Sequence, residues 1–484
     1  MDARDQRIAD LEVELAAKDA VIEEQRLRIV QLEREVAELK RLVVSLMEKL
    51  GQNSSNSHLP PSSDGPGGRS PAPKTKNRGS KRRRGGQRGH RGSKRELLPA
   101  DEVDHFVELF PEQCENCWVS LPQTRDPDAT RYQTTEVPPI RPETTEYRRH
   151  AVRCECGHTT HAKVDGVVPA SPFGPRLMSM IALFTGVYHL SRRQTVTVLQ
   201  DILGVRLSLG AVSSVEARVS DAVEQAVQEA RSQVENAPVK HADATSWLQS
   251  GKLRSLWTIA TKMATVFIIV ANGSAETIEP LFGACKGILV SDRATVFSFW
   301  PMKRRQICWA HLLRKFISFS ERDGPAQQFG QDLLDYTTLI FTYWHDYRDG
   351  KIDKKTFRTW MTPVRAQVED CLQRAAAASI DKLSGSCADM LAHQEALWTF
   401  VDRDDVEPTN NHAERELRAF VLWRKRSFGT QSDRGNVFAE RVMTVAHTAR
   451  KQNRNVLAFL TACCEAWQRD ATGPSLFAEE LAAA

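Results

Sequence analysis

The chain has 484 residues, which predicts about three domains, and its 41% hydrophobic and 26% charged residues are typical of a globular protein with a buried core. The longest strongly apolar stretch, residues 265–271, is too short to span a bilayer, and the polar N-terminus lacks a signal-peptide core, so we expect neither a membrane protein nor a secreted one. The ten cysteines are then expected to be reduced thiols or metal ligands. The net charge of +5 comes from one segment, because residues 65–95 hold 12 Lys and Arg and no Asp or Glu, against 54 basic and 61 acidic residues elsewhere. That concentration predicts a polyanionic partner.

The first expected element is a coiled coil over residues 1–50. From Ile8 to Leu50 the a positions of a heptad repeat are mostly β-branched and Leu predominates at d, which favours a two-stranded parallel coiled coil. Lys18 and Gln25 occupy d positions and weaken the middle of the repeat. The alternative, a single amphipathic helix packed on its own body, is disfavoured by a repeat of this length without Pro or Gly. We therefore predict a leucine zipper that makes a homodimer or higher oligomer.

Residues 51–98 are expected to be a disordered basic linker. Gly, Pro, Ser, Asn, Lys and Arg predominate up to residue 95, and so few large apolar side chains cannot offset the entropy of ordering. In KRRRGGQRGHRGSKR (81–95), glycines separate arginines that can follow a phosphate backbone or enter a minor groove. A solubilising linker is the alternative. The predicted DNA-binding residues of this basic arm, residues 69–95, are Arg82, Arg83, Arg84, Arg88 and Arg91.

Residues 99–170 contain two close cysteine pairs, CENC and CEC, separated by 36 residues. Four thiolates can close the tetrahedral shell of one structural zinc ion, and a histidine, His158 or His161, could replace one thiolate of the second pair. Two unrelated pairs of reduced cysteines in a β-rich module are the alternative. We predict a small zinc-binding β module. Its ligands are expected to be Cys114, Cys117, Cys154 and Cys156.

Residues 171–235 show helical periodicity in three short stretches, interrupted at Ser191 and between Gly204 and Gly210. This arrangement fits a helix-turn-helix module in which residues 208–218 form a recognition helix for a major groove. Short helical triplets are also common as plain structure, so the basic arm nearby is what favours DNA binding.

Four apolar runs of strand length follow within about 60 residues: VKHADATSWL, SLWTIATK, ATVFIIVA and GILVSDRA. The chain then becomes helical from RQICWAHLLRKF (305–316), with a polar helical insertion at about 317–405. Strands, an insertion and a later helix that bears a carboxylate predict a ribonuclease-H-like α/β core over residues 236–430. Residues 431–484 are expected to form a C-terminal helical region.

Cleavage and transfer of phosphodiesters without a covalent protein intermediate needs two metal ions about 4 Å apart, and Mg²⁺ takes oxygen ligands. Asp243 on the first run and Asp292 after the fourth, with a Glu from a late helix, could supply these ligands. Isolated Asp residues at strand ends are more often turn or capping residues, so this spacing alone is a weak indication.

Several stretches are similar to transposases of the insertion sequence 66 family: NSSNSHLPPSSD, GGQRGH, the cysteine pairs, SDRATVF, CWAHLLRKF and PTNNHAERELRAFVLWRKRSFG. The resemblance extends nearly from end to end, and the last stretch is long and specific. It implies a DDE transposase whose catalytic, metal-binding triad is Asp243, Asp292 and Glu414. It also implies two Mg²⁺ (or Mn²⁺) ions as cofactors. The chain departs from the family pattern at Ala244, where Glu is usual, and at Arg293, where Gly is common.

The motif Cys308-Trp-Ala-His311 resembles the CxxH motif that follows the second Asp in DDE transposases with an insertion. Only two soft ligands are visible there, so we interpret Cys308 and His311 as structural or DNA-contacting.

The stretch 410–421 is expected to be a helix with a buried stripe, which the sequence assigns to Ala413, Leu417, Phe420 and Val421. Glu414 and Glu416 flank this stripe, and helical geometry does not choose between them. An alternative role for Glu414 is a capping box with Asn411. Arg424, Lys425 and Arg426 are predicted phosphate contacts, although a solvated helix face would look the same.

These observations predict a DNA transposase that binds the ends of its insertion sequence, cuts strands and joins them to target DNA. The expected partners are double-stranded DNA, further copies of the chain and accessory proteins of the same element, with no membrane and a location at the bacterial nucleoid in the cytoplasm. The alternative is a non-catalytic DNA-binding regulator or an inactive transposase relic. A ribonuclease-H-like nuclease would have no need of the zipper and the basic arm.

Overall fold

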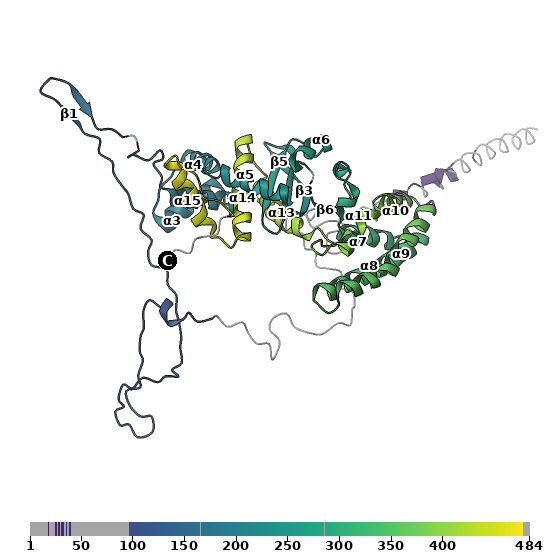
Figure 1. Ribbon diagram of the computed structural model, residues 1–484, viewed down its shortest axis with the longest axis horizontal. Helices are drawn as coiled ribbons and strands as arrows, with labels where there is room; N and C mark the ends of the chain where they lie inside the picture. Colours follow the sequence, from purple (N-terminus) through teal and green to yellow (C-terminus); the bar gives the residue numbers. More distant parts are fainter. Residues whose placement is uncertain are drawn as a thin grey trace, which may run out of the picture.

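A computed structural model describes residues 96–164, 166–284 and 286–477, together with ten single residues between Lys18 and Leu39 that all lie in a helix (Figure 1). Most of the predicted zipper and the whole basic arm therefore lie outside the described residues. Among the described zipper positions, Ile29, Leu32 and Leu39 are exposed in the single chain.

The centre of the fold is a five-stranded sheet with the order β5-β4-β3-β6-β7. Strands β5, β4 and β3 are antiparallel neighbours, whereas β3, β6 and β7 run parallel. The four apolar runs of the sequence form the first four strands. The strands are β3 (Val239–Gln249), β4 (Lys252–Ala260), β5 (Thr265–Val270), β6 (Ile288–Ser291) and β7 (Arg305–Ile307). The mixture of sheet and helix confirms an α/β core.

Strand β7 corrects the prediction that the chain is already helical from residue 305. Two of its three residues, Arg305 and Gln306, are polar yet almost fully buried, so no apolar run marks this strand. Gln306 is satisfied internally, since its Nε2 donates to the carbonyl oxygens of Ile307 and Leu397, whereas Arg305 finds partners within the protein for Nη2. A three-residue strand held in this way has no period that the sequence could reveal.

Helix α14 (Asp433–Lys451) covers the edge strand β5 and hydrogen-bonds to it. Three side chains at i, i+4 and i+8 accept from backbone N–H groups of β5: Glu440 from Ile269, Thr444 from Phe267 and Thr448 from Thr265. These contacts satisfy N–H groups on a strand edge that would otherwise be open. Helix α14 therefore belongs structurally to the α/β core, although it follows residue 430, where the sequence placed the end of that core.

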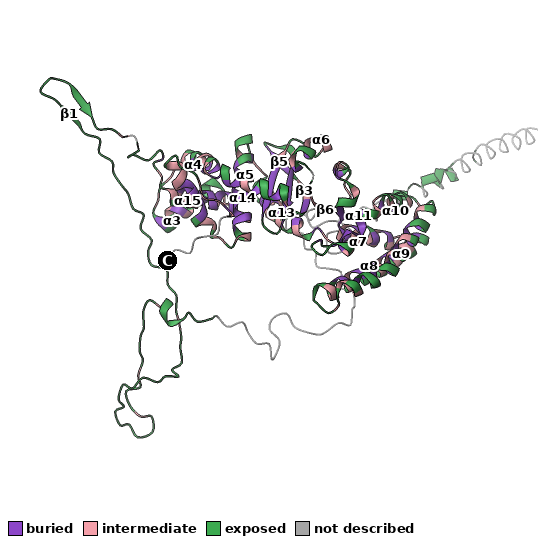
Figure 2. Cartoon of the chain, viewed as in Figure 1, coloured by how far each residue is buried: buried purple, intermediate pink, exposed green. Residues whose placement is uncertain are grey.

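The helices of residues 171–236 share one hydrophobic core with the sheet and with the C-terminal helices (Figures 1 and 2). The helices are α2 (Pro175–Ala182), a π-helical turn η3 (Leu183–Val187), α3 (Arg192–Leu203), α4 (Leu209–Ala222), α5 (Glu224–Asn236) and α15 (Val456–Gln468). Val212, Val215 and Val219 of the expected recognition helix are buried against these neighbours. The first turn of α4 is open to solvent, as are Ser214 and Asp221 further along, and the recognition role of the helix stays a prediction.

The insertion is a helical unit beyond β7, and its hydrophobic core also includes residues of β6 and β7 (Figure 1). It is joined to β7 by two hydrogen bonds: Gln306 Nε2 donates to the carbonyl of Leu397 at 3.2 Å, and Thr399 Oγ1 donates to the carbonyl of Arg305 at 2.6 Å. The helices are α7 (Trp309–Ser320), α8 (Pro325–Arg348), α9 (Lys354–Ala377), α10 (Leu383–Ala392), α11 (Gln394–Leu397) and α12 (Thr399–Asp402). Short elements elsewhere are η2 (Ala100–Glu102), α6 (Ala275–Ile278), η4 (Glu279–Phe282), η5 (Thr295–Phe297) and η6 (Met302–Arg304).

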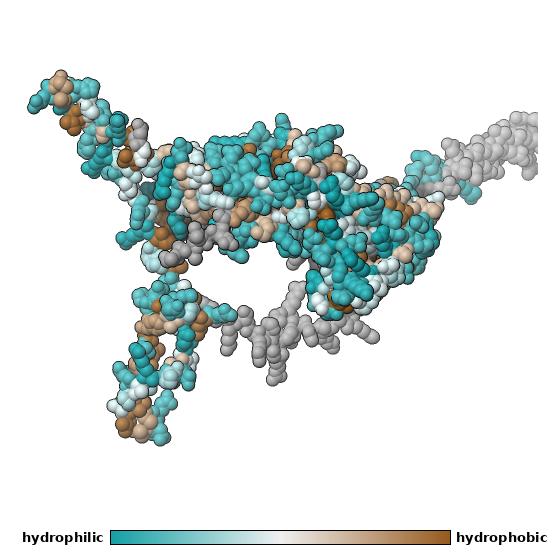
Figure 3. Space-filling model, viewed as in Figure 1, coloured by the Kyte–Doolittle hydropathy of each residue, from teal (hydrophilic) through white to brown (hydrophobic). Residues whose placement is uncertain are grey.

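Residues 96–170 contrast with this packed body, because nearly all of them are exposed (Figure 2). Their regular structure is one short hairpin, β1 (Ala151–Arg153) paired with β2 (Thr159–His161). Large apolar side chains lie in solvent here, including Leu109 at 88% and Trp118 at 74% exposure (Figure 3). Within the described ranges, none of the helices combines the length and the apolar character needed to cross a membrane.

Candidate active site at the carboxyl edge of the sheet

The two predicted aspartates come together where the parallel pairing of β3 with β6 ends, Asp243 within β3 and Asp292 directly after β6. The pairing of β3 with β6 ends at His241 and Val290, each two residues before the aspartate of its strand. Asp243 and Asp292 therefore occupy corresponding positions on neighbouring strands. The carboxyl edge of a sheet of this kind is where ligands bind in open α/β folds.

The carboxyl group of Asp243 is strongly perturbed. Burial raises its pKa from 3.8 to about 7, helped by the nearby charges of Glu414 and Asp292, while the N–H of Ala244, 2.9 Å from Oδ1, and the charge of Arg314 act in the opposite direction. Three carboxyl groups therefore share one electrostatic field. A cation between them would relieve both the desolvation and the mutual repulsion.

A buried arginine on the neighbouring strand β7 holds the turn that carries Asp292. Arg305, only 1% exposed, donates from Nη2 to the carbonyl oxygen of Asp292 at 3.1 Å and to Ser291 Oγ at 3.2 Å. The Asp292 carboxylate accepts from the N–H of Ala294 at 3.0 Å. These bonds fix the direction of the turn and leave the second carboxylate oxygen of Asp292 available to a ligand.

The third carboxylate comes from helix α13 (Asn411–Ser427), which is positioned by the residue before it. Asn410 is fully buried; its side-chain amide donates to the carbonyl of Ala242 at 2.7 Å, and its backbone N–H donates to Cys308 Sγ at 3.1 Å. Asn410 thus joins the start of α13 to β3 and to the end of β7. Because the N-cap residue is Asn410 and no side chain caps the helix, the capping-box alternative for Glu414 is wrong.

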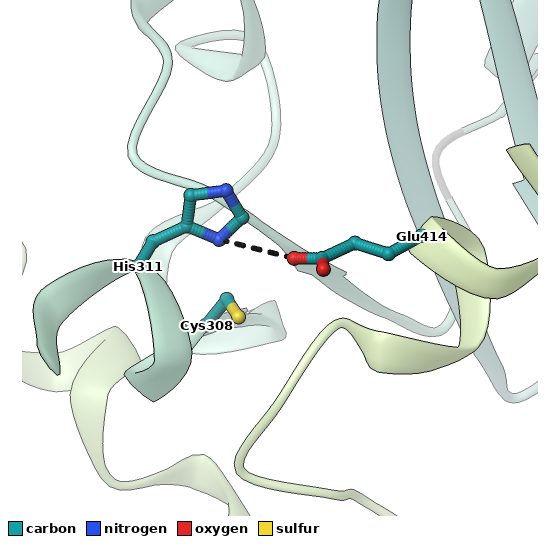
Figure 4. Close-up of side chains that lie close together, drawn as sticks. All are labelled: Cys308, His311 and Glu414. Carbon is teal, nitrogen blue, oxygen red and sulfur yellow. Dashed lines mark ion pairs between the residues drawn. The ribbon is translucent and has the colours of Figure 1, made fainter. Parts of the chain in front are cut away.

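The carboxylate of Glu414 points toward helix α7 rather than into solvent (Figure 4). Its Oε1 is 3.6 Å from His311 Nδ1 and its Oε2 is 3.5 Å from Arg314 Nη2. Both Oε1 and the facing Nδ1 are buried, and neither has a hydrogen-bond partner among the described residues. Buried polar atoms without partners are rare in folded proteins, so this pair marks a place where a ligand can bind.

Glu414 also supplies the third donor that the Cys308–His311 pair lacks in the sequence. Ligand atoms of Cys308, His311 and Glu414 lie within 4.8 Å of one another, and no other cluster of three such residues is found in the described ranges (Figure 4). Burial raises the pKa of the Cys308 thiol to about 11, so at neutral pH and without a metal it is a thiol that accepts the Asn410 N–H. In that state Cys308 acts as a positioning residue.

Two residues further along α13, Glu416 lies in a closed ionic network. Its carboxylate contacts Lys451 at 3.1 Å and hydrogen-bonds His447, with His412 at 3.8 Å. Burial acts to raise its pKa, but the hydrogen bond from His447 and the charge of Lys451 prevail and lower the pKa from 4.5 to about 2. Glu416 is thereby used in packing α13 against α14.

The other predicted residues are placed as follows. The four cysteines are close within each pair, but the two pairs do not form a cluster of three or more ligands in the described chain. Arg424 is directed inward, where it donates to Thr245 Oγ1 at 3.1 Å and to Ser246, so it is a packing contact between α13 and β3. Arg426 is exposed. The predicted stripe of α13 is buried as expected, except that Trp423 rather than Val421 completes it.

Three residues of the site were not assigned by the sequence. Asn410, Arg314 and Arg305 position the carboxylates, and the first two lie within stretches that the family resemblance already singles out. Their presence in these motifs is the signal that could have identified them. Nothing in the sequence distinguishes Arg305 from a surface arginine.

Comparison with known families agrees with this architecture. Residues 170–437 match the family described as Transposase IS66 family, and residues 12–96 match a family of unknown function, DUF6444. No curated protein matches the chain. The first match covers more than half of the sequence and all five strands of the sheet, and it marks the protein as a transposase. The chain belongs to the IS66 family of transposases.

Proposed function

We propose that this chain is a DDE transposase that binds the ends of its insertion sequence, cleaves a strand there and transfers the new end to target DNA. The observation that carries this proposal is the convergence of Asp243, Asp292 and Glu414 at the carboxyl edge of the sheet. Three antiparallel strands followed by two parallel ones, with the third acid on a helix after the insertion, support a ribonuclease-H-like core.

The residues of the site divide into ligands and supports. Asp243, Asp292 and Glu414 would hold two Mg²⁺ or Mn²⁺ ions, and the donor set fits, because carboxylate oxygens are the ligands these hard cations prefer. The bound ions would activate the attacking oxygen and stabilise the charge that develops on the phosphate. Asn410 and Arg305 hold the elements that carry these carboxylates, and Arg314 compensates part of their charge.

A non-catalytic DNA-binding regulator or an inactive relic is the competing function. It would have no reason to retain an Asp243 whose pKa is raised toward neutrality by burial and, to a smaller extent, by two further carboxylates. Groups perturbed in this way are costly in a purely structural site and are concentrated in active sites. The deciding experiment is cleavage of labelled element-end DNA by the full chain with Mg²⁺, followed by strand transfer to a plasmid. Absence of both products from a protein that still binds the ends would favour the regulator.

The N-terminal third is proposed to supply assembly and general DNA affinity. We expect residues 1–50 to dimerise the chain, so their deletion should halve the mass in light scattering. Neutralising Arg82, Arg83 and Arg84 should weaken specific and random duplexes alike, because each phosphate contact contributes about 0.9 to the log–log salt slope. An unchanged mass, or loss of only the specific complex, would contradict these two roles.

A structural zinc ion is proposed for residues 96–170. These residues expose large apolar side chains and bury almost nothing, so four thiolates on one ion would give the segment a closed centre to fold around. Protein purified without chelator should contain one zinc per chain, and replacing Cys114 and Cys154 with Ser should remove it. A metal-free native protein would count against the module.

A further inference from the structure

A second surface of interest lies away from the carboxylates, between the helices of residues 171–236 and the turn that joins α13 to α14. A cavity of about 750 Å³ opens there, lined by the starts of α3 and α4, by the end of α13 and by the start of α14. This volume is within the range of small-ligand and cofactor sites, about 300–1,000 Å³. We call it the basic cavity, because four arginines line it against one glutamate: Arg192, Arg193, Arg426 and Arg434 against Glu216.

Only two of the four arginines in the basic cavity are paired with other side chains of the protein. Arg192 is paired with Glu216 at 2.6 Å, and Arg434 donates to Ser213 Oγ at 2.7 Å. In the part of the chain that the structure describes, the guanidinium groups of Arg193 and Arg426 make no hydrogen bond or ion pair, and both residues are exposed. Two planar, permanently charged donors are thus available to an anion such as a phosphate.

Two helices begin at the basic cavity, and this adds to its affinity for anions. Helix α3, of 12 residues, starts after Ser191, and α14, of 19 residues, starts after Ser432; both serines line the cavity. The N-terminus of a helix carries a partial positive charge, which remains here although the Ser191 and Ser432 side chains already accept from the N–H groups of Gln194 and Gly435. Helix ends and arginines therefore favour the same negatively charged group.

The floor of the basic cavity is aromatic. The ring of His189 stacks on Trp423 with centroids 4.6 Å apart, and Trp423 in turn packs on Phe420 and Trp247 in a core cluster. His189 Nε2 is buried and has no hydrogen-bond partner among the described residues. At the rim, Phe428 is 74% exposed although it is a large apolar side chain.

Unusual backbone conformations are concentrated at the same place. His189 and Phe428 both have positive φ angles, 59° and 57°, which side-chain-bearing residues rarely adopt, and His189 follows the π-helical turn η3. The backbone directly after Phe428 is fixed, because a Cβ on the next residue, Gly429, would clash with the carbonyl oxygen of Leu248, and the Thr430 N–H donates to that same oxygen. Strained conformations that the fold maintains are typical of ligand sites.

We propose that the basic cavity binds one nucleotide that has been unstacked from the DNA strand, with its base on the ring of Phe428 and its phosphate between Arg193 and Arg426. This inference rests on the proposed function in taking DNA as the partner, and it adds a site that holds a base outside the helix. Stacking of a base on an aromatic ring, combined with arginine contacts to the backbone, is how single strands are held without a need for a particular sequence.

The test is photochemical crosslinking of the full chain to DNA that contains 5-iododeoxyuridine, without added metal so that cleavage does not intervene. Three probes are compared: a single strand, a duplex with a single-stranded 3′ overhang and a blunt duplex. We expect the peptide that contains Phe428 to be crosslinked by the first two probes and much less by the blunt duplex. Excess thymidine 5′-monophosphate should not compete at the concentrations at which the single strand does.

Affinity measurements on variants give a second readout. Phe428→Asn keeps a residue suited to positive φ but removes the ring. It should weaken binding of the overhang probe by about fivefold to a hundredfold, since stacking contributes about 1–3 kcal/mol per base and 1.4 kcal/mol is tenfold. Phe428→Tyr should restore it. The Arg193→Gln, Arg426→Gln double variant should lower the salt slope on single strands by about 0.7, because both arginines contact the same phosphate, whereas Arg206→Gln, an exposed arginine outside the cavity, serves as the matched control.

Crosslinks that map elsewhere, or wild-type affinity in Phe428→Asn, would overturn the inference. If the wild-type chain cleaves element ends and these results still hold, only the nucleotide site fails and the proposed function stands. If the wild-type chain binds none of the three probes, the proposed function and the nucleotide site fail together.

Discussion

Helix α13 carries a carboxylate on each of two faces, and the two differ in how completely the surrounding side chains compensate their charge. Glu416 is surrounded by Lys451, His447 and His412, which leave little of its charge uncompensated. Glu414 faces His311 and Arg314 at 3.5–3.6 Å, too far for a good hydrogen bond, and its buried Oε1 has no hydrogen-bond partner in the described structure. A carboxylate whose partners are complete stabilises the fold, whereas one whose partners are incomplete is available to a ligand.

The largest expected effect follows from removing the negative charge of Glu414, the carboxylate whose partners are incomplete. Glu414→Gln should lower end cleavage on the order of a thousandfold, since a metal ligand accounts for several kcal/mol of transition-state stabilisation and each 1.36 kcal/mol is tenfold. The melting temperature and DNA affinity should change little, because the carboxylate makes no close contact that folding depends on. Glu395→Gln, an exposed glutamate on α11, is the matched control. Substantial cleavage by Glu414→Gln would reopen the choice of the third ligand.

Substitution of Glu416, the carboxylate whose partners are complete, should instead lower stability and leave cleavage unchanged. Glu416→Gln leaves Lys451 buried without its counter-charge, and loss of one partner of a buried pair costs about 3 kcal/mol of unfolding free energy. Cleavage per folded molecule should be retained. The measurement is denaturant unfolding of both variants beside the wild type. Equal stability of Glu416→Gln and the wild type would show that the network is not structural, and would remove the contrast between the two faces.

Acid should affect the two carboxylate sites through different groups. The pKa of Glu416 is lowered to about 2, so the stability that its network contributes is complete above about pH 4.5 and is lost as the pH falls toward 2. For Asp243 the pKa is raised to about 7, so in the metal-free protein its burial costs increasing stability as the pH rises from about 4 to 7.

Metal binding must displace the proton of Asp243, so the apparent Mg²⁺ affinity should rise up to about tenfold per pH unit between pH 6 and 7 and level off above pH 8. Calorimetric titration at several pH values measures this directly. An affinity that does not change over this interval would place Asp243 outside the metal site. Asp243→Asn is the control, since it should remove both the pH dependence and most of the affinity.

The contrast between the two faces of α13 also shows what could be predicted from the sequence. Four strands and the buried stripe of α13 were predictable, because periodicity records burial along a single element. The choice between Glu414 and Glu416 was not, since it depends on partners far along the chain: Lys451 and His447 on α14 for one, and Asp243 on β3 for the other. Without the family resemblance, only the fold brings these residues together.

The same reasoning explains the missed strand β7 and the reassigned Arg424. Arg305 and Gln306 are buried where they donate to the carbonyl oxygens of Asp292 and Leu397, contacts that no local pattern encodes. Arg424 reads as a surface cation but donates to Thr245 and Ser246 of β3. Polar side chains that are satisfied over long sequence distances are the residues that composition and periodicity misplace.

The smallest expected effect concerns Arg314, which is 22% exposed and lies 3.5 Å from the Glu414 carboxylate. The positive charge of Arg314 lowers the pKa of Asp243 through space. Arg314→Gln should therefore raise this pKa and move the pH profile of cleavage to higher pH. The expected shift is a few tenths of a pH unit, at roughly the effective dielectric constant of a partly exposed site. Arg314→Lys should restore most of the shift, because charge rather than hydrogen-bond geometry is responsible. A rate lowered equally at all pH values would instead indicate that Arg314 orients Glu414 or contacts DNA. That outcome would show that Arg314 acts on the site around Glu414 through its position and contacts, and not through its electrostatic effect on Asp243.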